Sequence, residues 1–441
     1  MTPQSGQTAA ATHRNDRPDL RRLQRRTLGV LSAAQIAGGI GVATGAALSS
    51  LVVADISGSV AISGFAGTAT VLGAALLAIP AAQVAGRSGR RAGLLLAYGL
   101  AVIGCLICVG AIALRSWPLL LVGLVLFGGA SAGNLAARYS ATDLSPPGHA
   151  GRHLSLVVWA ATIGSVTGPN LADPAEDAAV ALGFGGEEGP FALAAVTFAL
   201  AALIVVAGLR PDPLLVARGT PGDSGTPDGG SGGGAAGPKR TLRGSWRVVR
   251  ETPDARRALV AIAVSHTAMV SIMSMTPVHL DHGGIGLSII GVVLSAHIAG
   301  MYVFSPLVGW LADRAGAIPV LVVGLFQLLL AAALAASAGP RDVALLSLGL
   351  FLLGTGWSCG LVAGSALLSE SVAIDHRPSA QGLSDLLMNV CGATGTVVAG
   401  VVVAAGSYAM LGVATAVLVV LPAVWLLSAH SGRAAVPRDL R

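Results

Sequence analysis

Twelve apolar runs, each about as long as a lipid bilayer requires, divide this chain almost from end to end. A membrane-spanning helix needs roughly 20 mainly apolar residues, because the hydrocarbon core offers no water to polar backbone groups. The runs lie near residues 28–53, 60–82, 92–114, 117–138, 153–171, 189–209, 257–279, 286–309, 318–338, 343–369, 383–405 and 408–428. This pattern predicts an all-α integral membrane protein with twelve transmembrane helices, whose main partner is the lipid bilayer.

Charged residues are too scarce to cover a water-facing surface. They make up 11% of the chain, whereas soluble proteins carry about 25%. The formal net charge of +6 does not indicate nucleic-acid binding, because the basic residues are not interleaved with stacking aromatic residues. The glycine-rich tract 229–234 lacks the Lys and Ser/Thr of a phosphate-binding loop, and no nucleophile–base arrangement is evident. These features argue against an enzyme or an ATP-driven pump and predict no cofactor.

The basic residues predict how the chain lies in the membrane. With a cytoplasmic N-terminus, every Lys and Arg except Arg115 and Arg341 falls on the cytoplasmic side, as the positive-inside rule requires. The external loop 171–190 is acidic instead. We therefore expect a multi-pass protein of the plasma membrane with both termini in the cytoplasm.

Two separate stretches of the first half of the chain repeat in the second half. Arg87–Gly89 aligns with Arg314–Gly316 at an offset of 227 residues. Leu154–Ser155 aligns with Leu383–Ser384 at an offset of 229. Agreement between independent stretches predicts two pseudo-symmetric bundles of six helices each.

The longest polar break joins these two halves. Its Gly/Ser/Pro tract, Gly219–Gly237, predicts a flexible coil. A basic segment after it, residues 244–257, is either a short amphipathic helix on the membrane surface or a solvated linker. The expected organisation is an N-terminal tail 1–26, a first bundle 27–209, a linker 210–256, a second bundle 257–428 and a C-terminal tail 429–441.

The loops after the second and eighth spans resemble the hallmark loop of the major facilitator superfamily, Gly-x-Leu-Ala-Asp-Arg-x-Gly-Arg-Arg. The second copy carries Gly309, Leu311, Ala312, Asp313, Arg314 and Gly316. The first copy carries Arg87, Gly89, Arg90 and Arg91, with Ala82 in place of the first Gly and Gly86 in place of the Asp. The fifth span also contains a Gly-x-x-x-Gly-Pro motif, Gly164, Gly168 and Pro169, that resembles the motif of this superfamily's exporters.

The chain resembles the twelve-helix drug/proton antiporters of this superfamily, and the resemblance implies an alternating-access carrier in which two bundles rock around a central cavity. It also implies an inner gate formed by Arg87, Gly89, Arg90, Asp313, Arg314 and Gly316. The motif in the fifth span has a plainer interpretation, because Gly-x-x-x-Gly also marks close helix packing.

Polar, aromatic and Met side chains within the spans are candidates for the substrate cavity or for proton coupling, because polar groups at membrane depth are costly. The candidates are Gln35, Asn134, Arg138, Trp159, His266, Met269, Met273, His297, Tyr302, Trp357, Asp385 and Asn389. Arg138 either acts in the cavity or extends to the headgroups. His266 and His297 are either proton relays or neutral core histidines, and the Met residues suit packing or an adaptable pocket.

Asp385 supports a more specific hypothesis. It would supply the carboxylate missing at Gly86 by pairing with Arg87 or Arg90, unless it simply stabilises the start of its own helix. His279, Asp281 and His282 have a spacing that suits a metal, but we expect a solvated loop there and no metal site.

The preferred function is proton-coupled export of hydrophobic small molecules, such as drugs or an antibiotic-like metabolite, by a monomeric transporter driven by the proton gradient. The scarcity of charges available to a cavity favours an apolar solute. Two alternatives stay open, namely import of a small polar nutrient and a membrane sensor or scaffold that transports nothing.

Overall fold

The structure, a computed structural model, describes residues 18–219 and 242–434, and within these ranges the regular elements are all helices. The first part contains α2 (Pro18–Ser57), α3 (Val60–Ser88), α4 (Arg90–Ala113), α5 (Trp117–Ser140), α6 (Ala150–Asn170), α7 (Ala172–Ala181), the 3-10 turn η1 (Gly186–Glu188) and α8 (Gly189–Gly208). The second part contains α11 (Pro253–His282), α12 (Leu287–Tyr302), α13 (Ser305–Ala315), α14 (Ala317–Ser337), α15 (Val343–Ser371), α16 (Arg377–Ala405) and α17 (Tyr408–Ala434).

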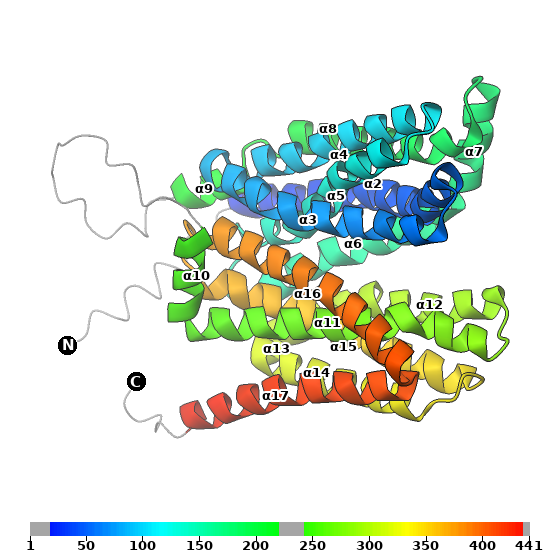
Figure 1. Ribbon diagram of the computed structural model, residues 1–441. Helices are drawn as coiled ribbons and strands as arrows, with labels where there is room; N and C mark the ends of the chain where they lie inside the picture. The colour runs from blue at the N-terminus through cyan, green and yellow to red at the C-terminus, as the bar shows by residue number, and fades with distance from the viewer. Residues whose placement is uncertain (1–17, 220–241, 435–441) are drawn as a thin grey trace, which may run out of the picture.

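These helices form two bundles that lie side by side, with α2–α8 in the upper half of Figure 1 and α11–α17 in the lower half. Within the described ranges, eleven helices are long and apolar enough to cross a membrane, or twelve if α6 and α7 are counted as one bent span. The predicted fold class, an all-helical protein of two bundles, is thereby confirmed.

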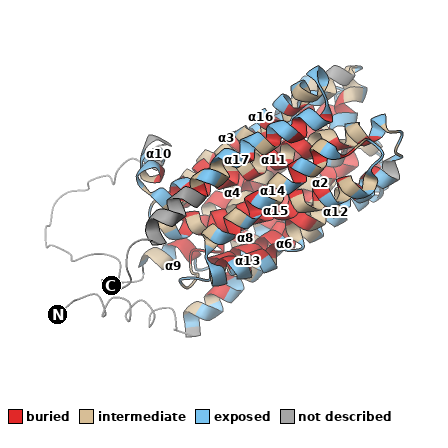
Figure 2. Cartoon of the chain, turned by 90° about the horizontal axis from the view of Figure 1, so that it is seen from below, coloured by how far each residue is buried: buried red, intermediate tan, exposed pale blue. Residues whose placement is uncertain are grey.

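Apolar side chains remain exposed along the outside of both bundles. Phe65, Phe326 and Leu421 are examples, with exposed fractions of 57%, 66% and 72%. Figure 2 shows buried positions running along the inside of the helix packing and exposed ones on the outer sides. An apolar outside of this kind suits contact with lipid.

The segment 171–190, expected as an acidic external loop, is largely helical in the structure. Helix α7 follows α6 after a bend of 49°. Pro169 lies inside the last turn of α6, where a proline cannot donate a backbone hydrogen bond. Asp173 stands in the first turn of α7, where the helix dipole favours a carboxylate. The eighth predicted span is also divided, into α12 and α13.

A single residue separates the helices of the hairpin α3–α4 and of its counterpart α13–α14. Gly89 occupies the first junction with φ of 93°, and Gly316 occupies the second with φ of 91°. Side chains with a Cβ rarely adopt this conformation, so both tight junctions favour glycine. The two positions are related by the repeat offset found in the sequence, which supports the pseudo-symmetry of the bundles.

Two short helices, α9 (Pro213–Gly219) and α10 (Leu242–Glu251), stand at one end of the molecule, which we call the linker end (Figure 1). Val249 of α10 is buried while Trp246 is 52% exposed, and α10 packs on α11 and α16. This packing favours the amphipathic helix over a solvated linker. Most of the predicted flexible tract, residues 220–237, and the outer parts of both predicted tails, residues 1–17 and 435–441, lie outside the described residues.

Candidate functional site

The two bundles meet at the linker end along two pairs of helices, α3 with α16 and α6 with α13. At each crossing the helices approach so closely that a glycine stands at the contact point. A Cβ atom at Gly382 would collide with the Cβ of Ala82, and a Cβ at Gly309 would collide with Ser155. The bundles are therefore in direct contact at this end, and the side chains buried there form the candidate site.

An ion pair between Arg138 of α5 and Asp385 of α16 joins the bundles. The Nη2 atom of Arg138 donates to Oδ1 of Asp385 at 2.7 Å, and the two side chains are 2% and 4% exposed. The guanidinium also donates to Ser365 Oγ at 3.3 Å and lies over the ring of Tyr139, 4.5 Å from its centroid. The alternative in which Arg138 extends to the headgroups is wrong, because the guanidinium is satisfied inside the protein.

Arg90, at the start of α4, forms a second buried set beside the first. It contacts Asp143 through two hydrogen bonds of 2.7 and 2.9 Å, and it donates to Gln381 Oε1 of the other bundle at 2.6 Å. Gln381 is held in turn by a bond of 3.1 Å from its Nε2 to Ser369 Oγ. The predicted pairing of Asp385 with Arg87 or Arg90 was wrong. Asp143, in the turn after α5, satisfies Arg90.

Asp313, the acid of the second hallmark loop, connects α13 to α6. Its carboxylate accepts the backbone N–H groups of Gly151 at 2.8 Å and Arg152 at 2.9 Å, in the first turn of α6. These donors lack partners within their helix and carry partial positive charge, so a carboxylate stabilises them. Arg314 instead lies over the ring of Trp310, at 5.3 Å from its centroid, and Arg87 is exposed.

Three predicted residues from different helices meet in the second bundle. We call His266, Tyr302 and Trp357 the aromatic cluster. Trp357 Nε1 donates to His266 Nδ1 at 3.0 Å, and the ring of Tyr302 meets that of Trp357 edge-on at 5.8 Å between centroids. A Cβ at Gly392 of α16 would stand 2.7 Å from His266 Nε2, so the cluster lies beside the helix that carries Asp385. Asn389 lies one turn beyond Asp385 and donates to its backbone oxygen at 2.8 Å.

Several other candidates have surroundings typical of helix packing. His297 is fully buried, and its Nδ1 is 2.8 Å from the carbonyl oxygen of Leu350, which favours the core histidine. Met269 is buried and Met273 packs against the same core, which favours packing. Trp159 is 40% exposed on the same face of α6 as exposed apolar residues, a position that suits lipid rather than a cavity.

Two candidates of the first bundle lie within that bundle. Asn134 accepts the hydroxyl of Tyr98 at 2.8 Å, and both side chains pack against Gly38 of α2. Gln35 is buried on the same helix. Within the described ranges neither residue has a hydrogen bond to the aromatic cluster, so their roles in a cavity stay predictions.

The motif of the fifth span holds α6 against α2. Gly164 faces Gly39 so closely that a Cβ at Gly164 would stand 2.8 Å from the backbone of Gly39, and Thr44 Oγ1 donates to the carbonyl of Gly168 at 2.8 Å. Close helix packing therefore accounts for both glycines, and Pro169 precedes the bend into α7. The export role of the motif stays a prediction.

His279 lies at the end of α11 rather than in a solvated loop. Its ring stacks on Tyr408 at 4.2 Å between centroids, and its Nε2 is 3.2 Å from the carbonyl oxygen of Ala338. Among the residues that the structure describes, no group of three His, Cys, Asp or Glu side chains is arranged to hold a metal ion.

Known proteins resemble this chain over most of its length. The family model of the Major Facilitator Superfamily matches residues 29–289 and 259–439. The chain is 34% identical over 406 residues to the uncharacterized MFS-type transporter YdeG of Bacillus subtilis (strain 168), covering 91% of this chain and 92% of that protein. It is 36% identical over 406 residues to the uncharacterized MFS-type transporter YddS of the same organism, covering 90% and 89%.

A solved structure shares the fold. It is a bacterial homologue of the iron transporter ferroportin in an outward-facing state, with a TM-score of 0.69 and 15% sequence identity, and the match covers 92% of this chain and 99% of that chain. At this identity the likeness concerns the arrangement of helices alone.

Proposed function

The chain belongs to the major facilitator superfamily and is a secondary transporter of a small molecule, and from that premise we propose that it exports apolar small molecules in exchange for protons. Drugs and antibiotic-like metabolites are the expected substrates. The observation that carries the proposal is that, among the described residues, the charges buried where the bundles meet are paired with one another.

The buried charges at the linker end satisfy one another. Arg138 pairs with Asp385 and Arg90 pairs with Asp143, so none of the four is left to bind a charged solute. Removing one partner of a buried ion pair leaves an uncompensated charge, which is strongly unfavourable. The neighbouring aromatic cluster contributes a hydrogen-bonded His266 and two aromatic rings. Such surroundings favour a solute without charge.

Contacts at the linker end also support a particular state of the transport cycle. The crossings at Gly382 and Gly309 and the bond from Arg90 to Gln381 close this end. If the linker end faces the cytoplasm, as the basic residues predict, the central cavity opens outward in this state. The bundles must then separate at these contacts for the cavity to open inward.

Asp385 is the residue we propose for proton coupling. Its carboxylate is the acidic half of the ion pair that spans the bundles. A proton taken up from outside neutralises the carboxylate, weakens its attraction to Arg138 and so allows the linker end to open. Release of that proton to the cytoplasm would restore the pair and return the transporter to the outward-facing state with its solute.

A second candidate function is import of a small polar solute. The aromatic cluster favours it, because an imidazole, a phenol and an indole lie together there. Aromatic rings with adjacent polar groups suit stacking and hydrogen bonding to a polar ring.

Transport assays in cells separate the two candidates. The neutral fluorescent dye Nile red is loaded into an efflux-deficient bacterial host that expresses the full chain. We expect lower dye accumulation than with an empty vector, restored by an uncoupler. Asp385→Asn should accumulate dye like the empty vector, whereas Asp281→Asn, at an exposed position at the end of α11, should behave like the unmodified protein. Increased accumulation of every lipophilic compound tested would reverse the direction.

A further inference from the structure

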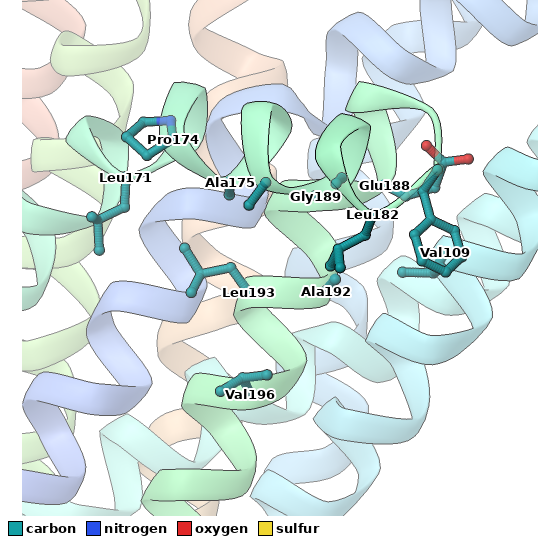
Figure 3. A pocket seen from close by; sticks show the side chains of 13 residues that line it. Val109, Leu171, Pro174, Ala175, Leu182, Glu188, Gly189, Ala192, Leu193 and Val196 are labelled. Atoms are coloured by element: carbon teal, nitrogen blue, oxygen red, sulfur yellow. The ribbon is translucent and has the colours of Figure 1, made fainter.

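A pocket of about 400 Å³ lies on the first bundle at the end opposite the linker end. We call it the α7 pocket. It is lined by α7, η1 and α8, with Val109 of α4 at one side, and Figure 3 shows its side chains. Thirteen residues line it, among them Ala178, Ala192, Leu193 and Val196. Glu188 is the one lining residue with a charged or polar side chain.

The surroundings of the α7 pocket indicate that it opens toward lipid rather than toward the other bundle. Val196 in its wall is 64% exposed, and so are apolar residues further along the same helices, Leu203 of α8 at 62% and Leu106 of α4 at 60%. Exposed apolar surface of this extent on a membrane-spanning bundle is the surface that lipid covers. A molecule dissolved in the bilayer therefore reaches the pocket without passing through the central cavity.

Glu188 is the exception in this apolar lining. Its side chain is only 8% exposed, and within the described residues its Oε2 atom has no hydrogen-bond partner. Gly185 lies against that oxygen, where a Cβ would stand 2.6 Å away. A buried carboxylate oxygen without a donor is costly, because the protein does not replace the hydrogen bond that water would supply. A cation bound in the pocket would supply the missing donor.

We propose that the α7 pocket binds a lipophilic amine dissolved in the membrane, with its ammonium group at Glu188 and its apolar body along α8. The volume falls within the range of roughly 300–1,000 Å³ typical of small-molecule sites. A phospholipid fits less well, because no Lys, Arg or His is among the thirteen lining residues to meet its phosphate. This site is separate from the linker-end contacts and goes beyond the proposed function.

Equilibrium binding tests the site without any transport measurement. The full chain is placed in phosphatidylcholine nanodiscs, and the binding of tritiated decylamine is compared with that of tritiated decanol, which has the same body without the charge. Empty nanodiscs correct for partition into lipid. We expect saturable binding of decylamine, about tenfold tighter than that of decanol, a ratio that corresponds to about 1.4 kcal/mol.

Three variants locate the ligand. Glu188→Gln should weaken decylamine binding about tenfold while leaving decanol binding unchanged, and Glu187→Gln serves as the matched control with unchanged binding. Ala192→Phe, which places a ring in the pocket from an exposed position, should abolish binding of both compounds. Gel filtration and the melting temperature check that each variant folds. The proposal is overturned if Glu188→Gln binds decylamine as tightly as the unmodified protein, or if Ala192→Phe does.

Discussion

Arg138 and Asp385 lie 247 residues apart in the chain and meet across the two bundles, with 2.7 Å between Nη2 and Oδ1. Both side chains are almost fully buried. Breaking such a pair by removing one partner costs about 3–5 kcal/mol, because the remaining charge stays in a medium of low polarity. This contact therefore stabilises the state that is closed at the linker end.

A charge exchange tests whether these two residues are partners. Asp385→Arg alone should abolish transport, because two guanidinium groups then face each other. Adding Arg138→Asp should restore about a tenth of the transport rate or more, since coupling energies between direct partners are recovered in such cycles. Adding Arg90→Asp instead should restore nothing, because Arg90 is bound to Asp143. Equal rescue by both second changes would contradict the assignment, provided that all variants insert normally.

Gln381 provides a second test of closure at the linker end. It is the residue of the second bundle that accepts a hydrogen bond from Arg90, at 2.6 Å. Gln381→Ala removes this link, worth about 1.5–3 kcal/mol for a bond to a charged group, and should shift the population toward the state open at the linker end. Spin labels at the exposed positions Ser88 and Ala373 should report longer distances by pulsed electron resonance. Asn134→Ala, within the first bundle, is the control, and an unchanged distance distribution in Gln381→Ala would refute the prediction.

Gly309 tests the close approach of α13 and α6. A valine there would collide with Ser155 and with the carbonyl oxygen of Gly151, so the bundles could no longer meet. Gly309→Val should therefore reduce transport by more than about tenfold and stabilise the state open at the linker end. Gly67→Val is the matched control, because no atom lies within 4 Å of a Cβ built at that glycine in α3. Rates and spin-label distances like those of the control would show that the contact does not limit closure.

Trp357 tests the aromatic cluster. Trp357→Phe keeps an aromatic ring but removes the N–H that donates to His266 Nδ1. The loss of one hydrogen bond of this kind costs about 1 kcal/mol, and if the cluster lines the route of the solute, KM should rise severalfold with little change in kcat. Trp246→Phe, on the exposed face of α10, should change neither constant. A fall in melting temperature with unchanged KM would mean that the cluster only stabilises the bundle.

The fold could be predicted because its main determinants are local. A run of apolar residues long enough to cross the bilayer is visible without knowing what it packs against. The tight junctions at Gly89 and Gly316 were visible for the same reason, because both glycines stand at equivalent places in a repeated motif. Helix α7 was missed since it is short, acidic and not apolar enough to be seen as a span.

The partners within the site could not be predicted from the sequence. Arg138 and Asp385 were each recognised as candidates, but their pairing depends on how α5 and α16 are rotated about their axes and where they cross. Proximity to the hallmark loop suggested Arg87 and Arg90 as partners of Asp385 instead. The partner of Arg90, Asp143, carries only a weak signal in the sequence, namely an acid that follows the fourth span shortly after Arg138.

At both crossings of the linker end a glycine makes room for the facing helix, but the glycine belongs to the hallmark loop at one crossing and to the facing helix at the other. At one crossing Gly309 of the hallmark loop provides the space, whereas at the other Ala82 stands in that position and Gly382 on the facing helix provides it. The space needed for close packing is thus a property of the two facing positions together, and a glycine at either of them provides it. Searches for the hallmark loop as a string of letters will overlook proteins that have moved the glycine across, so such searches should score pairs of facing residues.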